Sequence, residues 1–120
     1  GLPPPNVTGS LHVGHALVVA IEYLIVRYHR MKGDNTLWIP GVDHAAIATQ
    51  NLVEKKIRKE QDVTRHQLGR EAFLKEVDSF VAITKDRILT QIRSLGASLD
   101  WSRLAYTLDD DRSLAVRTIF

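Results

Sequence analysis

The chain has 120 residues, of which 44% are hydrophobic and 25% charged, and this composition excludes a disordered tail or a collagen-like chain. That length suits one domain or part of one, and a compact chain of this size buries about two-thirds of its unfolded surface. Sixteen basic and fourteen acidic residues leave a net charge of +2, which permits nucleic-acid contact without indicating it. The absence of cysteine excludes disulfides, thiolate metal sites and cysteine nucleophiles, and it fits a reducing, cytoplasmic setting.

Neither a signal peptide nor a membrane-spanning segment is predicted. The first ten residues contain three prolines and no basic residue, and the longest apolar run, residues 16–21, is too short to cross a bilayer. The chain begins at Gly1 without a methionine and stops at Phe120 inside an apolar helical pattern. We therefore expect residues 1–120 to be a single, incomplete domain segment.

The first third of the chain predicts an extended segment followed by a long helix. Residues 3–9 must be extended or turning, because proline removes a hydrogen-bond donor and disfavours helix in the residue before it. Residues 8–10 supply helix-start side chains, the helix is predicted over residues 11–31, and Gly33 ends it. Its apolar residues recur at three- and four-residue spacings, so we expect burial over much of its circumference. These residues are Leu17, Val18, Val19, Ile21, Leu24, Ile25, Val26 and Tyr28.

A short strand and a second helix come next. Residues 35–39 are β-prone and are predicted to stop at Pro40-Gly41, as the second strand of a parallel βαβ unit whose first strand lies before Gly1. The following helix is predicted to reach about residue 59. Its inward side chains would be Ala48, Leu52 and Val53. The basic side chains Lys55, Lys56, Arg58 and Lys59 are predicted to be a solvated helix end, with an RNA site as the alternative.

The second half of the chain is predominantly helical in pattern. Thr64 and Gln67 have the spacing of a capping box, and the helical sequence that they open runs to about residue 95, bent or broken midway, and ends at Gly96. Its predicted core side chains are Leu68, Phe73, Val77, Phe80, Ile88 and Ile92. Residues 98–108 are predicted to be irregular or extended, and residues 109–111 to cap a final helix. The predicted class is α/β, mostly helical with one or two short parallel strands.

Two histidines at the start of the first helix are the strongest candidates for chemistry. His12 and His15 are three residues apart, so both imidazoles lie on one face of the first turn. That end of a helix has free N–H groups and the positive end of the macrodipole, so it attracts anions. Gly14 lacks a side chain and lets a flat ring or a phosphate lie against the backbone. This pattern predicts a polyphosphate site.

Two alternatives compete with that interpretation. A lone histidine on a helix is usually structural. A metal site would combine His12 and His15 with His44 or Asp43, but histidine pairs that bind zinc on helices are usually four residues apart with a glutamate between them. We therefore predict no resident metal.

Asp43 is the candidate for binding an amino group. It follows the predicted strand, at the end where ligands bind in open parallel sheets. A carboxylate there can hold an ammonium group by charge-assisted hydrogen bonds. Asp is also a common N-cap, and the spacing alone leaves both roles open.

The histidine motif and its flanks resemble a known family. His12-Val13-Gly14-His15 resembles the signature of class I aminoacyl-tRNA synthetases, and residues 3–12, 41–50, 68–71 and 95–103 are similar to valyl-tRNA synthetases. The similarity spans essentially all 120 residues. It implies a Rossmann-like nucleotide-binding domain, with the histidine signature and amino-acid pocket in residues 1–59 and a helical continuation toward an editing insertion in residues 60–120.

The resemblance also implies an activity and its residues. The full-length enzyme would use ATP with Mg²⁺ to convert valine to valyl-adenylate and then transfer it to tRNA(Val), in the cytoplasm and without a membrane partner. Catalytic roles would fall to His12 and His15. The ATP-binding set would be Thr8, Gly9, His12, Gly14 and His15. The amino-acid-binding set would be Pro3, Pro4, Asn6 and Asp43.

The sequence departs from the family pattern in one motif. Where the resemblance leads us to expect Gly-Thr-Asp-His-Ala-Gly, the chain has Val42 and Ala46 at the second and sixth positions. The Lys-Met-Ser-Lys-Ser loop, the editing domain and the anticodon-binding region are absent, so we expect the segment alone to be inactive or very weak.

The alternative functions are an isoleucyl-type synthetase, another nucleotidyltransferase with the histidine signature, and a non-enzymatic helical RNA-binding or structural module.

Overall fold

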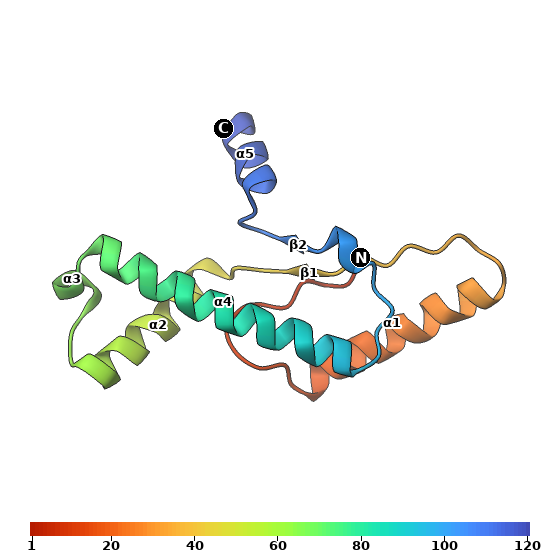
Figure 1. Ribbon diagram of the computed structural model, residues 1–120, viewed down its shortest axis with the longest axis horizontal. Helices are drawn as coiled ribbons and strands as arrows, with labels where there is room; N and C mark the ends of the chain where they lie inside the picture. The colour runs from red at the N-terminus through yellow and green to blue at the C-terminus, as the bar shows by residue number, and fades with distance from the viewer.

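The computed structural model describes all 120 residues, and they form an elongated, flat molecule of 59 × 36 × 18 Å (Figure 1). Its radius of gyration is 17.2 Å, whereas a compact chain of this length would have roughly 14 Å. The accessible surface of 8390 Å² is also larger than the roughly 6,500 Å² expected for a compact chain of this mass. The two-thirds burial predicted from length is therefore not reached.

The structure is mostly helical, with two short strands. In chain order the elements are α1 (Val13–Met31), β1 (Gly41–Val42), α2 (Ala46–Gln61), α3 (Arg65–Leu68), α4 (Arg70–Ser94), a 3₁₀ helix (Trp101–Arg103), β2 (Ala105–Tyr106) and α5 (Asp110–Ile119). The prediction of a mostly helical chain with short parallel strands is confirmed. No helix combines the length and the apolar composition that a bilayer crossing requires.

Three extended segments lie side by side in parallel. In the sheet, Gly41 of β1 pairs with Ala105 of β2. On the other side of β1, residues 2–7 run in the same direction, joined by a hydrogen bond from Leu2 N–H to the Ile39 carbonyl (2.9 Å) and by the bridge between Asn6 and Asp43. The prediction that the first strand of the βαβ unit lies before Gly1 is therefore wrong, because residues 2–7 take its place. Three successive prolines lack N–H groups, so this segment makes few ladder bonds and does not look like a strand in sequence.

The predicted strand at residues 35–39 is also displaced. The paired residues are Gly41 and Val42, and the chain stays extended through Pro40, which was expected to stop it. Proline has no N–H group, but its carbonyl still accepts a hydrogen bond, and Pro40 O accepts from the N–H of Ala105 at 3.2 Å. The central segment therefore continues to the bridge residue Asp43.

Helix α1 begins at Val13, with His12 as its N-cap, rather than at residue 11 with a cap from residues 8–10. It buries only Val19 and Val26. The broad burial predicted for this helix is wrong, because no other part of the chain covers its remaining apolar side chains. Those left exposed are Leu17, Val18, Ile21, Leu24, Ile25 and Tyr28.

The main core lies where α1 and α4 cover one face of the extended segments (Figure 1). Val7 and Val42 on that face are fully buried, together with Ile88 and Ile92 of α4. The aromatic rings of Tyr23 on α1 and Trp38 stack at 5.8 Å, and the indole N–H of Trp38 donates to Glu22 at 2.8 Å. Burial of these side chains fixes α1 beside the sheet.

A smaller core joins α2 to α3 and α4. It consists of Val53, Ile57 and Phe73, with Val63, Leu68, Val77 and Phe80 packed against it. The predicted core of the second half is thus confirmed, whereas Ala48 and Leu52, predicted to face inward, are exposed. The buried face of α2 is formed instead by Thr49, Val53 and Ile57. The basic side chains at the end of α2 are exposed as predicted, Lys55, Lys56, Arg58 and Lys59 alike.

The predicted helix ends are mostly confirmed. Thr64 and Gln67 form the capping box of α3, and Gly96, at φ +74°, follows the end of α4. The break expected midway comes instead near the start of the segment, at Gly69, and α4 is continuous. Asp109 takes the N-cap position of α5 but makes no cap bond, because its carboxylate accepts from the N–H of Tyr106 at 2.8 Å and pairs with Arg112. Helix α5 buries no residue and projects away from the rest of the molecule (Figure 1).

Candidate functional site

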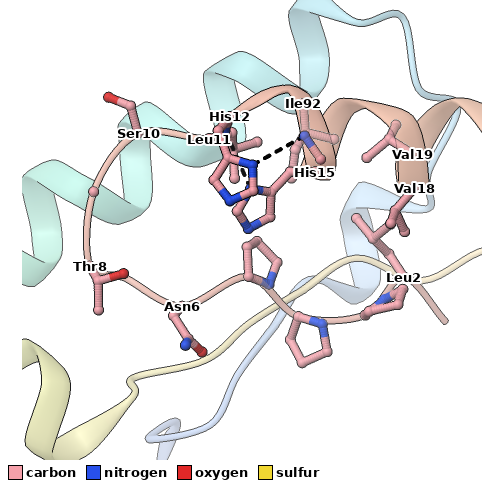
Figure 2. Close-up of a pocket in the computed structure, with 15 residues that line it drawn as sticks. Leu2, Asn6, Thr8, Ser10, Leu11, His12, His15, Val18, Val19 and Ile92 are labelled. Carbon is pink, nitrogen blue, oxygen red and sulfur yellow. Dashed lines mark hydrogen bonds between the residues drawn. The ribbon is translucent and has the colours of Figure 1, made fainter.

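A cavity lies between the proline-rich segment and the first turns of α1 (Figure 2). It has a volume of about 610 Å³, within the range of ligand pockets. All the predicted nucleotide-binding and amino-acid-binding residues except Asp43 line it. They are Pro3, Pro4, Asn6, Thr8, Gly9, His12, Gly14 and His15. The extended segment, the loop and the first turn of α1 thus contribute side chains to one space.

The same cavity has lining residues that sequence reasoning missed. Ile92 of α4 forms part of its wall, and the neighbouring side chain of Gln91 accepts a hydrogen bond from the backbone N–H of Leu11 at 2.9 Å. This contact ties the loop before the histidines to α4. No signal in the sequence predicts it, because the two residues are 80 positions apart.

The two imidazoles cap the helix that carries them. Nδ1 of His12 accepts a hydrogen bond from the N–H of Gly14 at 3.1 Å, and Nδ1 of His15 accepts from the N–H of His12 at 3.3 Å. Their ring centroids are 4.0 Å apart. Because each Nδ1 is an acceptor, the proton of each neutral ring lies on Nε2. Figure 2 shows both rings pointing into the space enclosed by the loop from Leu2 through Asn6 and Thr8.

Gly14 is required by this arrangement of rings. A Cβ atom at this position would lie 2.9 Å from Cε1 of His12, closer than side-chain atoms approach one another. The glycine therefore makes room for the His12 imidazole. The pKa of His15 is lowered below its ordinary value of 6.5, mainly by partial removal of the ring from water and to a smaller extent by repulsion from His12. The ring is therefore neutral at physiological pH.

Asp43 lies at the same end of the parallel segments but does not line the cavity. Its Oδ1 accepts hydrogen bonds from the N–H of Ala45 at 3.2 Å and from the hydroxyl of Thr107 at 3.1 Å. The cap of α2 is Ala45, so Asp43 stabilises the turn before the helix instead of serving as its N-cap. Its backbone bridges Asn6, which does line the cavity.

The other histidines lie elsewhere. His29 pairs with Asp34, His66 is exposed beside a separate hollow, and His44 contacts Thr107. No group of three or more His, Asp or Glu side chains is arranged to hold a metal ion. The structure thus does not bring His44 or Asp43 to the histidine pair as the metal alternative requires.

Comparison with known proteins identifies the family of the chain. The family model of tRNA synthetases class I (I, L, M and V) matches residues 1–120. The chain is 60% identical to the mitochondrial valine–tRNA ligase 1 of Arabidopsis thaliana over 99% of this chain and 11% of that protein. It is 57% identical to a valine–tRNA ligase of Homo sapiens over 99% of this chain and 9% of that protein.

The chain therefore spans about a tenth of the length of these relatives. A mitochondrial valine–tRNA ligase of Homo sapiens is 57% identical over the same share of this chain. The family model covers every residue, including the segment with the histidine pair and the segment with Asp43. The chain belongs to the family of class I tRNA synthetases (I, L, M and V).

Proposed function

We propose that this chain forms the nucleotide-binding part of a valine–tRNA ligase that activates valine with ATP and transfers it to tRNA(Val). The observation that carries the proposal is the pair of Nε2–H donors of His12 and His15 in one cavity, at the positive end of α1. The relatives at 57% to 60% identity, whose names specify valine and tRNA, supply the substrate class.

In the proposed reaction the valine carboxylate attacks the α-phosphorus of ATP and pyrophosphate leaves. No protein nucleophile is needed, so the chain contributes positioning and electrostatic stabilisation. The Nε2–H groups of His12 and His15 would donate to phosphate oxygens on which charge develops. A preorganised donor of this kind stabilises a transition state by about 3–4 kcal/mol.

The cavity suits a nucleotide whose metal is bound by its own phosphates. None of the residues that line it is acidic, so Mg²⁺ would be held by phosphate oxygens and water. The rings of His12 and His15 and the backbone at Thr8 and Gly9 would contact the nucleotide, with Gly14 leaving the ring of His12 room to do so.

The parallel segments support a partial Rossmann-like fold. In such folds ligands bind beyond the carboxyl ends of parallel strands. The loop to the histidines follows the first extended segment, and Asp43 follows β1 at the same edge. Asp43 would hold the valine ammonium, and Pro3, Pro4 and Asn6 would line the amino-acid side. Contact with tRNA would come through the full-length enzyme, for which we propose a cytoplasmic location.

Substrate identity is tested by pyrophosphate exchange with the complete enzyme that contains this chain. We expect valine to drive exchange more efficiently than isoleucine or threonine. Efficient exchange with isoleucine instead would identify an isoleucyl-type enzyme. RNA binding with steep salt dependence and no exchange with any amino acid would identify a non-enzymatic module.

The phosphate role of the histidines is tested by His12→Asn. Asparagine is a good N-cap, so this variant keeps the helix start and removes the Nε2–H donor. We expect the kcat of exchange to fall about 100-fold to 1,000-fold, with unchanged helix content by circular dichroism. The exposed His66→Asn is the matched control. An unchanged kcat in His12→Asn would contradict the role.

A further inference from the structure

The hydroxyl of Thr107 lies at the centre of a small polar cluster beside Asp43. It donates to Asp43 Oδ1 at 3.1 Å and accepts from the backbone N–H of His44 at 2.9 Å. It also contacts Nδ1 of the His44 ring. Thr107 follows β2 directly, and its own N–H donates to the carbonyl of Val42, which holds it in register with β1.

The capacity of a hydroxyl group determines the direction of these bonds. A threonine hydroxyl has one proton and two acceptor lone pairs. Its proton goes to the Asp43 carboxylate, which can only accept. One lone pair accepts from the N–H of His44, and the other faces Nδ1 of the His44 ring, which also lies 3.4 Å from Asp43 Oδ1. All three positions of the hydroxyl are used, so Thr107 has one defined orientation.

The same contacts divide the two oxygens of Asp43. Oδ1 accepts from Ala45 N–H and from Thr107, whereas Oδ2 has no hydrogen-bond partner in the chain. The Asp43 side chain is 36% exposed, so Oδ2 can be reached from outside. The bonds to Oδ1 hold the Asp43 carboxylate in place, and the accessible Oδ2 can accept a hydrogen bond from a ligand ammonium group.

We propose that Thr107 is a positioning residue that fixes the Asp43 carboxylate so that Oδ2 meets the amino group of valine. The inference rests on the proposed function, because it takes Asp43 as the ammonium ligand. The loop after Asp43 gives a physical reason for such support. Ala45 and Ala46 have positive φ angles of 51° and 22°, so the turn that supplies the other donor to Oδ1 is strained.

The test compares Thr107→Val, which keeps the shape and removes the hydroxyl, with Thr107→Ser, which retains the hydroxyl. In the complete enzyme we expect Thr107→Val to raise the valine KM of pyrophosphate exchange about tenfold, as for loss of a hydrogen bond to a charged group. The ATP KM and kcat should stay unchanged, and Thr107→Ser should restore most of the valine KM. Thr118→Val, an exposed threonine on α5, is the matched control.

Asp43→Asn separates the inference from the proposed function. A valine KM unaffected by Asp43→Asn contradicts the ammonium role itself. If Asp43→Asn raises the valine KM and Thr107→Val does not, only the positioning role fails. Thr107→Val is also introduced into the Asp43→Asn variant. An effect on the valine KM as large there as in the unmodified enzyme overturns the positioning role, because a residue that acts through the Asp43 carboxylate should have little effect once that carboxylate is gone.

Thr107→Ala also removes the hydroxyl, but it does not place a methyl group where the hydroxyl was, as Thr107→Val does. Hydrogen exchange across residues 104–107 shows whether β2 is intact in each variant. A raised valine KM in Thr107→Ala with β2 intact supports the proposal, and an unchanged KM with β2 intact overturns it.

Discussion

At the scale of single residues, the two nitrogens of each imidazole have different roles in the proposed site. Nδ1 of His12 and Nδ1 of His15 accept backbone N–H groups at the start of α1, as a structural role requires. This leaves both Nε2–H groups for a ligand. The structural and phosphate-binding interpretations of the motif are therefore compatible, because capping sets the tautomer that a phosphate site needs.

The first prediction at this scale concerns pH. Because the pKa of His15 lies below 6.5 in the folded chain, the unfolded chain binds this proton more readily. The stabilisation from the neutral cap is complete above pH 6.5 and is lost as the pH falls through the lowered pKa. We expect the amides of residues 12–16 to open more often at pH 5.5 than at pH 7.5 in hydrogen exchange corrected for intrinsic rates.

A direct titration of His15 by NMR checks the cause. His12→Asn removes the repulsion from His12 and should raise the pKa of His15 toward its ordinary value. The pKa of His15 should stay below that value in this variant, because partial removal from water is the larger cause. A midpoint above 6.5 in the unmodified chain would contradict the prediction.

At the scale of elements, the site depends on how a loop is fastened to a helix. The segment before α1 is held by Gln91 on α4 through the N–H of Leu11. We expect Gln91→Ala to leave that N–H without a protein partner and to destabilise the loop by about 1 kcal/mol. Hydrogen exchange of residues 11–15 in the complete enzyme should then be about fivefold faster.

Gln91→Glu is the control for that prediction, because a carboxylate keeps the acceptor at the same distance from the backbone. It should leave exchange at residues 11–15 nearly unchanged. Equal acceleration in both variants would show that the amide group acts through something other than the bond to Leu11.

Helix starts and ends were the elements best predicted from sequence. Thr64 with Gln67, and the glycines after α1 and α4, act within a few residues of one another, so local rules suffice. The strands were misplaced because their pairing depends on residues 36 to 65 positions away, as in the bonds from Val7 to Asp43 and from Ala105 to Pro40. Ala46, with φ 22°, stands where the family pattern led us to expect glycine, and this strain is visible only in the structure.

At the scale of the whole molecule, the chain leaves a stripe of apolar side chains on α1 in contact with water. Leu17, Ile21, Leu24, Tyr28 and Met31 are 52% to 85% exposed. They recur every three or four residues on one face of the helix. A contiguous exposed patch of this kind promotes binding of apolar probes and association.

We therefore expect the 120-residue chain to bind the dye ANS, and Leu17→Glu combined with Leu24→Glu to reduce that binding severalfold. Helix content should be unchanged, because glutamate and leucine have similar helix propensities. The matched control, Ile83→Glu, removes an exposed apolar side chain from α4 and should have a smaller effect. ANS fluorescence unaffected by the double variant would show that another surface binds the dye.

The amino-acid sequence by itself determined the helices, most of their ends and most of the residues that line one cavity. Most of residues 3–15 line this cavity, because the extended segment, the turn and the helix start follow one another directly in the chain. Only the tertiary structure decided the parts made by distant residues: the parallel pairing of residues 2–7 with residues 39–43, the wall at Ile92, and the contact of Thr107 with Asp43. Local patterns contain no information on such contacts, because the pairing of segments is selected by burial of the whole core.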